Sequence, residues 1–131
     1  MAFSIIVNEG RDWLLTNDFQ SSGSLFVGLL KTTDINTAPA ASATLASITE
    51  LSGAGYARQA VTFSAPSGQA TAGSQVTFTF TGAPTNNGAT GWFICTVSSG
   101  TSGTLIGAVN LAAARTYANG DTQKVTPTLA D

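Results

Sequence analysis

The sequence contains no histidine, a single cysteine and few charged residues, and each scarcity argues against a class of function. Without histidine the usual general base is missing, so Ser-His-Asp and Cys-His catalytic arrangements and most zinc sites are not expected. The lone Cys95 cannot form an internal disulfide, so cysteine usage does not tie the fold to an oxidising compartment. It ends the apolar run Trp92–Cys95, where we expect a small buried hydrophobic residue rather than a reactive thiol.

Charged residues make up only 9% of the chain, whereas an ordinary soluble domain carries about 25%. The net charge is −2, and the five basic residues are spread along the chain without a cluster that could neutralise phosphates. Nucleic-acid binding is therefore not expected. A neutral, hydroxyl-rich surface costs little to desolvate, which suits permanent assembly with other proteins. An extracellular β-domain with a Ser/Thr-rich surface would have the same composition, and composition alone leaves both interpretations open.

The 131 residues and their 43% hydrophobic content predict one globular domain, residues 1–131, with its own core. The longest apolar run, Leu25–Leu30, is short and interrupted by Gly28, so no membrane-spanning segment is predicted. The N-terminus has no basic segment before its apolar residues, so we do not expect a signal peptide. These features predict a protein made in the cytoplasm of the cell that expresses it.

One N-terminal helix is predicted over about residues 8–19. Asn8 suits the N-cap, and Glu9 favours the positive end of the helix dipole. Leu15 and Phe19 form an apolar pair at the i,i+4 spacing of a helix.

About seven strands are predicted from residue 24 onward, joined by loops rich in Gly, Ser, Thr and Asn. The clearest is Gln75–Thr81, where apolar and hydroxyl side chains alternate. The Asn119–Gly120 pair predicts a tight turn before the last strand, and Pro127 predicts an edge position for that strand. The seven predicted strands are Ser24–Lys31, Ser47–Leu51, Tyr56–Phe63, Gln75–Thr81, Gly91–Val97, Thr104–Asn110 and Lys124–Leu129. This pattern indicates a mainly β fold, an antiparallel β-sandwich with one N-terminal α-helix.

The carboxylates do not form a convincing catalytic or metal site. Glu9 and Asp12 are one turn apart, but the helix N-terminus explains them without a substrate cleft. The pairs Asp34 with Asn36 and Asn119 with Asp121 each offer two oxygens, whereas calcium takes six to eight. Ordinary turn chemistry explains both pairs. We therefore predict no catalytic, cofactor-binding or metal-binding residues.

Other candidate motifs have structural explanations. The glycines of Gly53-Ala54-Gly55 lack the spacing of a phosphate-binding loop. Five aromatic residues could form a sugar-binding platform, but all of them sit in apolar patterns and are predicted to pack in the core. Tyr117, in a loop beside Arg115, is predicted to be the most exposed aromatic. The core candidates are Trp13, Tyr56, Phe78, Phe80 and Trp92.

Five short segments carry a resemblance to a known family. They are Asn8–Leu15 and Leu25–Leu29, then Thr49–Leu51 and Gly55–Ala60, and finally Ala118–Thr122 before a Thr-rich strand. In this order they resemble a family of small virion proteins of tailed bacteriophages. Some proteins of this kind are decoration, or cement, proteins on the capsid exterior. The resemblance implies that role, and it carries no catalytic motif.

Together these observations predict a capsid decoration protein on the outside of the virion, without enzymatic activity or cofactor. Its expected partner is the major capsid protein, which it would bind as a dimer or trimer at symmetry axes, stabilising the head by mass action. The alternative is a phage tail or fibre component that binds a host receptor or glycan. A third class, a small glycan hydrolase, would need two convergent carboxylates that the sequence poorly supplies.

Overall fold

A computed structural model describes residues 5–10, 25–31, 39–63 and 70–130 of the chain. The described residues form a mainly antiparallel β fold, with a helical segment at residues 8–10. Ten strands are present in these ranges: β1 Ile5–Ile6, β2 Leu25–Lys31, β3 Thr49–Glu50, β4 Gln59–Val61, β5 Ala70–Ala72, β6 Val76–Thr79, β7 Ala89–Cys95, β8 Leu105–Arg115, β9 Thr122–Val125 and β10 Thr128–Ala130.

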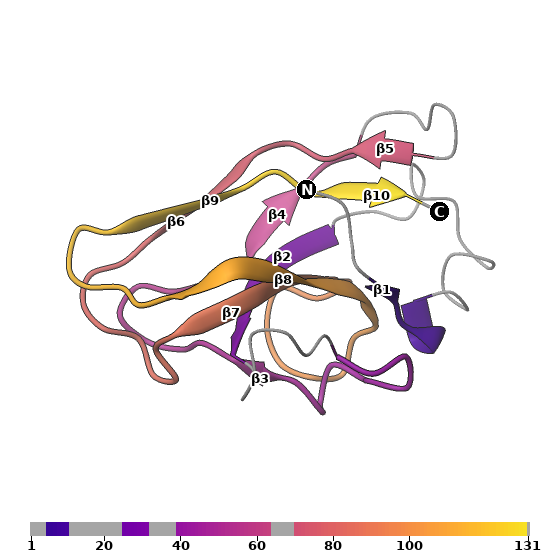
Figure 1. The fold of residues 1–131 in the computed structure, drawn as a ribbon, viewed down its shortest axis with the longest axis horizontal. Coiled ribbons are helices and arrows are strands. Elements are labelled where there is room, and N and C mark those ends of the chain that lie inside the picture. The colour runs from indigo at the N-terminus through magenta and orange to yellow at the C-terminus, as the bar shows by residue number, and fades with distance from the viewer. Residues whose placement is uncertain (1–4, 11–24, 32–38, 64–69, 131) are drawn as a thin grey trace.

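The main layer is a six-stranded antiparallel sheet in the order β1-β8-β7-β2-β3, with β4 also paired to β2 (Figure 1). Its centre is β7, which is buried at every position. A strand that is buried on both faces has a continuous run of apolar residues instead of alternating apolar and polar ones. Trp92–Cys95 is such a run. The sheet must therefore be covered on both sides.

The second layer is built from two short antiparallel ribbons, β6 with β9 and β5 with β10. The amide of Gly73 donates to the carbonyl of Pro127 at 2.7 Å, which links the two ribbons where β5 gives way to β6. Phe63, just after β4, forms an isolated bridge with Gly73, so the chain passes from the main sheet into this layer. Figure 1 shows the ribbons lying over β2, β7 and β8, which makes the fold a β-sandwich.

The larger core lies between the two layers. Val76 and Phe78 of β6 point inward, whereas Thr77 and Thr79 are exposed, as the period of two requires. Opposite them, the main sheet contributes alternate side chains from its central strands, including Trp92. The remaining buried members include Leu25, Val27, Leu29, Leu51, Val61, Phe80, Ile94, Ile106, Tyr117 and Val125.

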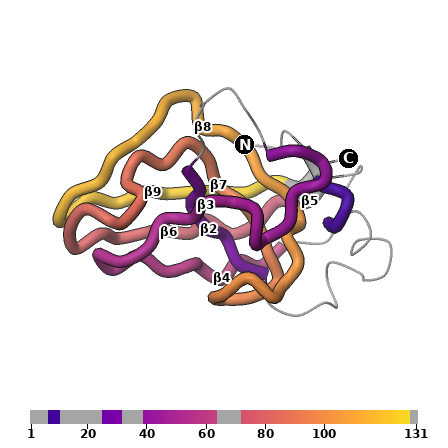
Figure 2. Tube along the Cα trace, turned by 90° about the horizontal axis from the view of Figure 1, so that it is seen from below, coloured from indigo at the N-terminus to yellow at the C-terminus, as the bar shows by residue number. Residues whose placement is uncertain are grey.

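A second, smaller core covers the opposite face of the main sheet. Phe93 and Cys95 of β7 project to this side, one residue out of phase with Trp92. Leu45, in the segment that leads into β3, packs on them and is 2% exposed. Val7, before the helical segment, completes the same cluster. Figure 2 lets the reader follow the segment from residue 39 to β3 from below.

The structure confirms the predicted fold class, and a strand overlaps each of the seven predicted strands. The predicted last strand divides into β9 and β10 around Pro127, and β9 pairs with β6 alone among the described strands, as an edge strand does. Two short strands, β1 and β5, were not predicted.

The predicted helix begins as expected near residue 8, while residues 11–19 of that prediction lie outside the described ranges. The predicted turn is present, with the amide of Asp121 donating to the carbonyl of Ala118 at 3.1 Å.

Gly28 is a position where the close approach of neighbours requires the absence of a side chain. A Cβ atom added there would lie 2.6 Å from Cε1 of Phe93 and 2.9 Å from the hydroxyl oxygen of Tyr56. We expect Gly28→Ala to destabilise the protein by about 1–3 kcal/mol, the usual cost of overpacking a core. Gly82→Ala, whose nearest neighbour would be Cβ of Ala54 at 3.7 Å, is the matched control. Equal stability of the two variants in urea unfolding would contradict this packing.

Candidate functional site

The most developed polar arrangement in the described residues is an ion pair between Glu50 of β3 and Arg58, which precedes β4. The guanidinium binds the carboxylate in a bidentate manner, with Nε at 2.9 Å from Oε1 and one terminal nitrogen at 2.7 Å from Oε2. The Arg58 side chain is 3% exposed and that of Glu50 is 24% exposed. Bidentate pairing fixes the orientation of both groups as well as neutralising their charges.

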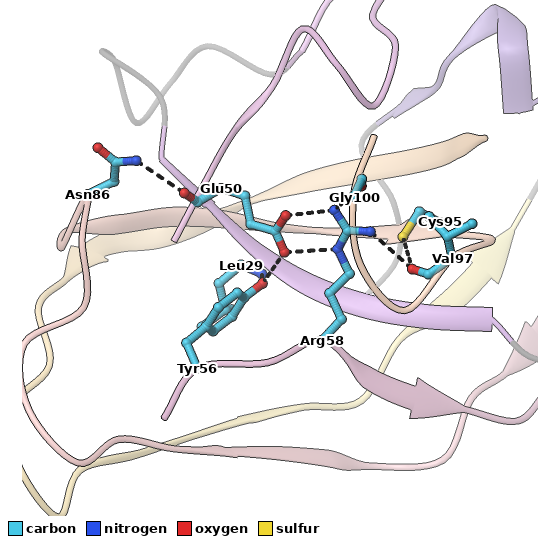
Figure 3. A network of polar contacts seen from close by, with 8 residues as sticks. All are labelled: Leu29, Glu50, Tyr56, Arg58, Asn86, Cys95, Val97 and Gly100. Atoms are coloured by element: carbon cyan, nitrogen blue, oxygen red, sulfur yellow. Dashed lines mark hydrogen bonds and ion pairs between the residues drawn. The ribbon is translucent and has the colours of Figure 1, made fainter. Parts of the chain in front are cut away.

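Tyr56 extends this pair into the main sheet. Its hydroxyl donates to Oε1 of Glu50 at 2.7 Å and accepts from the backbone amide of Leu29 in β2 at 2.8 Å. Figure 3 shows the tyrosine and the guanidinium approaching the same carboxylate. The ring of Tyr56 also stacks on Phe78 of the second layer, with centroids 5.7 Å apart. One side chain therefore connects β3, β2 and the opposing ribbon.

Arg58 also anchors the loop between β7 and β8. Its terminal nitrogens donate to the carbonyls of Val97 at 3.0 Å and Gly100 at 2.9 Å. Its guanidinium carbon lies 5.4 Å from the centroid of the Phe93 ring, within the range of a cation–π contact. Burial alone would lower the pKa of Arg58, but the hydrogen bonds and charge of Glu50 raise it above its ordinary value. The guanidinium therefore stays charged and holds the β7–β8 loop through its hydrogen bonds.

We call the side chains of Glu50, Tyr56 and Arg58 the polar clamp. Its charges neutralise each other, and its hydrogen bonds end on backbone groups of the same chain. This arrangement can hold strands and a loop in fixed relative positions. Carboxylates that act in acid–base catalysis must instead face a substrate, and the carboxylate of Glu50 faces Arg58 and Tyr56 (Figure 3).

The two tyrosines of the sequence, Tyr56 and Tyr117, are both expected to resist ionisation in the folded protein. Burial, followed by the negative charge of Glu50, raises the pKa of Tyr56 far above its ordinary value, and burial raises the pKa of Tyr117 to about 12. The unfolded chain ionises near the ordinary value of 10.0. Because the folded-state pKa is higher, the neutral tyrosines contribute stability that is complete below pH 10 and is lost as the pH rises toward 12.

This expectation is checked by titrating the phenolate absorbance of the native and denatured protein in parallel. The denatured chain should titrate near 10.0, and the native protein should show little phenolate until the pH approaches 12 or the fold is lost. A native transition near pH 10 would show that the tyrosine hydroxyls are solvated.

An open cleft of about 660 Å³ lies beside the clamp. Thr49, which precedes Glu50 in β3, and Asn86 contribute to its wall. The side-chain amide of Asn86 donates to the Glu50 carbonyl at 3.2 Å, and Asn86 has a φ of 60°, the left-handed region that few residues other than glycine adopt. The described residues that line the cleft are Leu30, Lys31, Pro39, Ala40, Ser42, Ala43, Ser47, Ile48, Thr49 and Asn86.

The residues weighed from the sequence occupy structural positions where the structure describes them. Glu9 accepts a hydrogen bond from the Leu105 amide at 3.4 Å, and Asp121 accepts one from the Ala118 amide at 2.8 Å within its turn. Asp12, Trp13, Asp34 and Asn36 lie outside the described ranges. All three residues of Gly53-Ala54-Gly55 have positive φ, and the Tyr56 amide donates to the Gly53 carbonyl across this turn.

Cys95 is buried, as predicted, and its thiol donates to the Val97 carbonyl at 3.2 Å. Burial raises the pKa of this thiol above its ordinary value. A protonated and inaccessible thiol is a poor nucleophile. Trp92, Phe78 and Phe80 are likewise in the core, and Tyr56 packs against it.

The prediction that Tyr117 is exposed was wrong. It is 5% exposed, and its ring stacks on Phe80 with centroids 4.1 Å apart and planes 8° apart. Its hydroxyl donates to Gln123 at 3.0 Å, and its amide donates to the side chain of Asn87 at 2.9 Å. The neighbouring Arg115 is exposed, so sequence proximity to a charge was a poor guide to the environment of the aromatic ring.

Sequence reasoning missed the polar clamp. The available signal was Arg58 itself, because a cation in a strand-like segment of a chain with only five basic residues invites a search for its partner. Among the basic residues that the structure describes, Arg58 is the buried one, with 9% of the whole residue exposed. The resemblance drawn from the sequence already contained all three residues, in Thr49–Leu51 and Gly55–Ala60.

Two kinds of feature are absent from the described ranges. No group of three or more His, Cys, Asp or Glu side chains in that part of the chain is placed to hold a metal ion. No helix among the described residues is long and apolar enough to cross a membrane.

The protein is a β-sandwich in which the ion pair of the polar clamp holds strands and the β7–β8 loop in place. A family model described as "Podophage GP4 fiber I protein gp80" matches residues 6–128, nearly the whole chain. The chain belongs to this family and is a bacteriophage virion structural protein. No curated protein and no solved structure matched it.

Proposed function

We propose that this protein is a component of a virion fibre, that it contacts the host surface, and that it catalyses no reaction. The observation that carries the proposal is the match to a family described as a podophage fibre protein over residues 6–128. The sequence predicted a capsid decoration protein, with a tail or fibre component as the alternative. The family description favours the alternative.

The described surface supports a role in assembly. The outer face of the β6–β9 ribbon exposes Thr77, Thr79, Thr122 and Lys124. Hydroxyl side chains can be buried against a partner at a lower cost than charged ones. A subunit with this surface can join other fibre subunits, including copies of itself, through contacts that depend little on charge. Such contacts should withstand high salt, because screening weakens interactions between charges.

A role as a capsid decoration protein is the second candidate, and the same low charge fraction of 9% favours it. In that role the partner would be the major capsid protein, and the interface would stabilise the shell by binding its assembled form. A virion without its fibre component should lose adsorption to the host. A virion without its decoration protein should instead lose head stability.

The experiment is to produce virions from a phage in which the gene for this protein carries an early stop codon, with the protein supplied from a plasmid as the control. The fibre proposal predicts stable, DNA-filled heads that adsorb poorly to host cells, and restored adsorption in the complemented virions. Virions that adsorb normally but release DNA at a lower temperature would contradict the fibre proposal and support decoration.

A further inference from the structure

We propose that Asn119 is a site of spontaneous deamidation in the folded protein, whereas Asn87 is protected from the same reaction. The chain contains two Asn-Gly pairs, Asn87-Gly88 and Asn119-Gly120. In such a pair the glycine has no side chain to hinder the approach of its backbone nitrogen to the asparagine side chain. Both pairs have this advantage, so a difference between them must come from the fold. This inference does not depend on the proposed function.

The reaction needs only water and hydroxide from the solvent. Hydroxide removes the proton of the glycine amide, and the nitrogen attacks Cγ of the asparagine. The new N–Cγ bond closes a succinimide ring while the Cγ–Nδ2 bond breaks, and ammonia leaves with a proton from water, which restores the hydroxide. Water then opens the ring at one of its two carbonyl carbons. Attack at Cγ gives aspartate, whereas attack at the backbone carbonyl carbon gives isoaspartate, in which the chain continues through Cγ.

Asn119 lies at the exposed tip of the turn before β9. Both Asn119 and Gly120 are exposed, and a Cβ atom added at Gly120 would meet no atom within 4 Å. No hydrogen bond to the described part of the chain holds the Asn119 side chain. One contact opposes the reaction, because the Gly120 amide donates to the carbonyl of Phe80 at 2.8 Å. The reaction at Asn119 therefore requires one hydrogen bond to open.

The side chain of Asn87 is instead held at both of its polar atoms. Its Oδ1 accepts from the amide of Tyr117 at 2.9 Å and from the amide of Gly88 at 3.0 Å. Its Nδ2 donates to the carbonyl of Tyr117 at 3.0 Å. The nitrogen that would attack is thus one of the groups that hold the side chain. Three hydrogen bonds must open before Cγ of Asn87 can turn toward the Gly88 nitrogen.

The number of bonds to open sets the expected difference between the two sites. A hydrogen bond of average net strength makes local opening about fivefold less frequent. Asn87-Gly88 has two more bonds to open than Asn119-Gly120, so in the native protein it should react about 25-fold more slowly. Both pairs lose these contacts in the unfolded chain, where we expect them to react at equal rates.

Deamidation changes both the charge and the backbone of the turn. It adds one negative charge to a chain whose net charge is −2. The new carboxylate lies two residues from Asp121, whose own carboxylate accepts from the Ala118 amide at 2.8 Å. Isoaspartate also inserts a methylene group into the backbone before Gly120, which displaces the Gly120 amide from the Phe80 carbonyl. The modified turn is therefore expected to be more open.

The test incubates the purified full-length protein with and without urea, at a mildly alkaline pH where both tyrosines stay neutral. Peptide mapping by mass spectrometry follows the replacement of the amide by a carboxyl group at each asparagine, and chromatography separates the aspartate and isoaspartate peptides. We expect Asn119 to react about 25-fold faster than Asn87 without urea and at the same rate as Asn87 in urea. Asn119→Gln should abolish most isoaspartate formation in the native protein.

Hydrogen exchange gives an independent readout of the turn. The deamidated protein, separated by anion-exchange chromatography, should exchange the amides of Gly120 and Asp121 faster than the unmodified protein, with no change in β7. Equal rates at the two asparagines in the native protein would overturn the proposal. So would the absence of reaction at native Asn119, or a rate at Asn119 that urea does not raise, since the bond to Phe80 would then not control the reaction.

Discussion

Replacing Arg58 with methionine is expected to lower the free energy of unfolding by about 3 kcal/mol. Methionine preserves much of the aliphatic length, so the main loss is the charge that neutralises Glu50. The value lies at the lower end of the range for broken buried pairs, because the Glu50 side chain is 24% exposed and water can partly solvate it. The loop carbonyls of Val97 and Gly100 also lose the hydrogen bonds from Arg58, although the Cys95 thiol still donates to Val97. Chemical denaturation of both proteins measures the difference.

Two further variants make this prediction specific to the clamp. Lys124→Met removes an exposed cation and should change stability by less than about 0.5 kcal/mol. The double variant Arg58→Met with Glu50→Gln should be more stable than the sum of the single losses predicts, because the two residues interact directly. Amide hydrogen exchange in residues 97–100 should also accelerate in Arg58→Met. A loss no larger than that of Lys124→Met would mean that the clamp does not stabilise the fold.

Replacing Phe78 with alanine is expected to cost about 3–5 kcal/mol, the range for truncating a buried aromatic residue. Phe78 is 1% exposed and lies in the core between the two layers, where its ring stacks on Tyr56 with planes 12° apart. The truncation therefore leaves a cavity and also removes the packing that supports a member of the clamp. Urea unfolding at constant pH measures the loss.

Thr77→Ala is the control for Phe78→Ala, because Thr77 is the next residue of the same strand and points to solvent. It should cost less than about 1 kcal/mol. If the two variants lost similar stability, the assignment of the inner and outer faces of β6 would be incorrect.

Local patterns in the sequence were sufficient to predict the strands whose two faces have different environments. The alternation in Val76–Thr79 predicts β6 because one face meets the core and the other meets solvent. The apolar run ending at Cys95 predicts a central strand because both faces are covered. Neither β1 nor β5 could be predicted in this way, because they are short and become strands by pairing with β8 and β10. Their structure depends on the partner rather than on a local pattern.

The clamp depends on contacts between residues far apart in the chain. Arg58 reaches Val97 and Gly100, which are separated from it by 39 and 42 positions. No periodicity within one segment encodes such a contact. Tyr117 shows the same limit, since its stacking partner Phe80 belongs to another part of the chain. The cleft likewise combines Lys31, Asn86 and residues 39–49, and topology alone brings them together.

The location of the protein on the intact virion tests the central claim most directly. Purified phage can be incubated with an antibody raised against this protein, labelled with gold, and examined by electron microscopy. The mutant virions grown without the protein provide the control for non-specific label. The account predicts gold on the fibres and little on the heads. Gold distributed over the capsid surface, with unlabelled fibres, would contradict it.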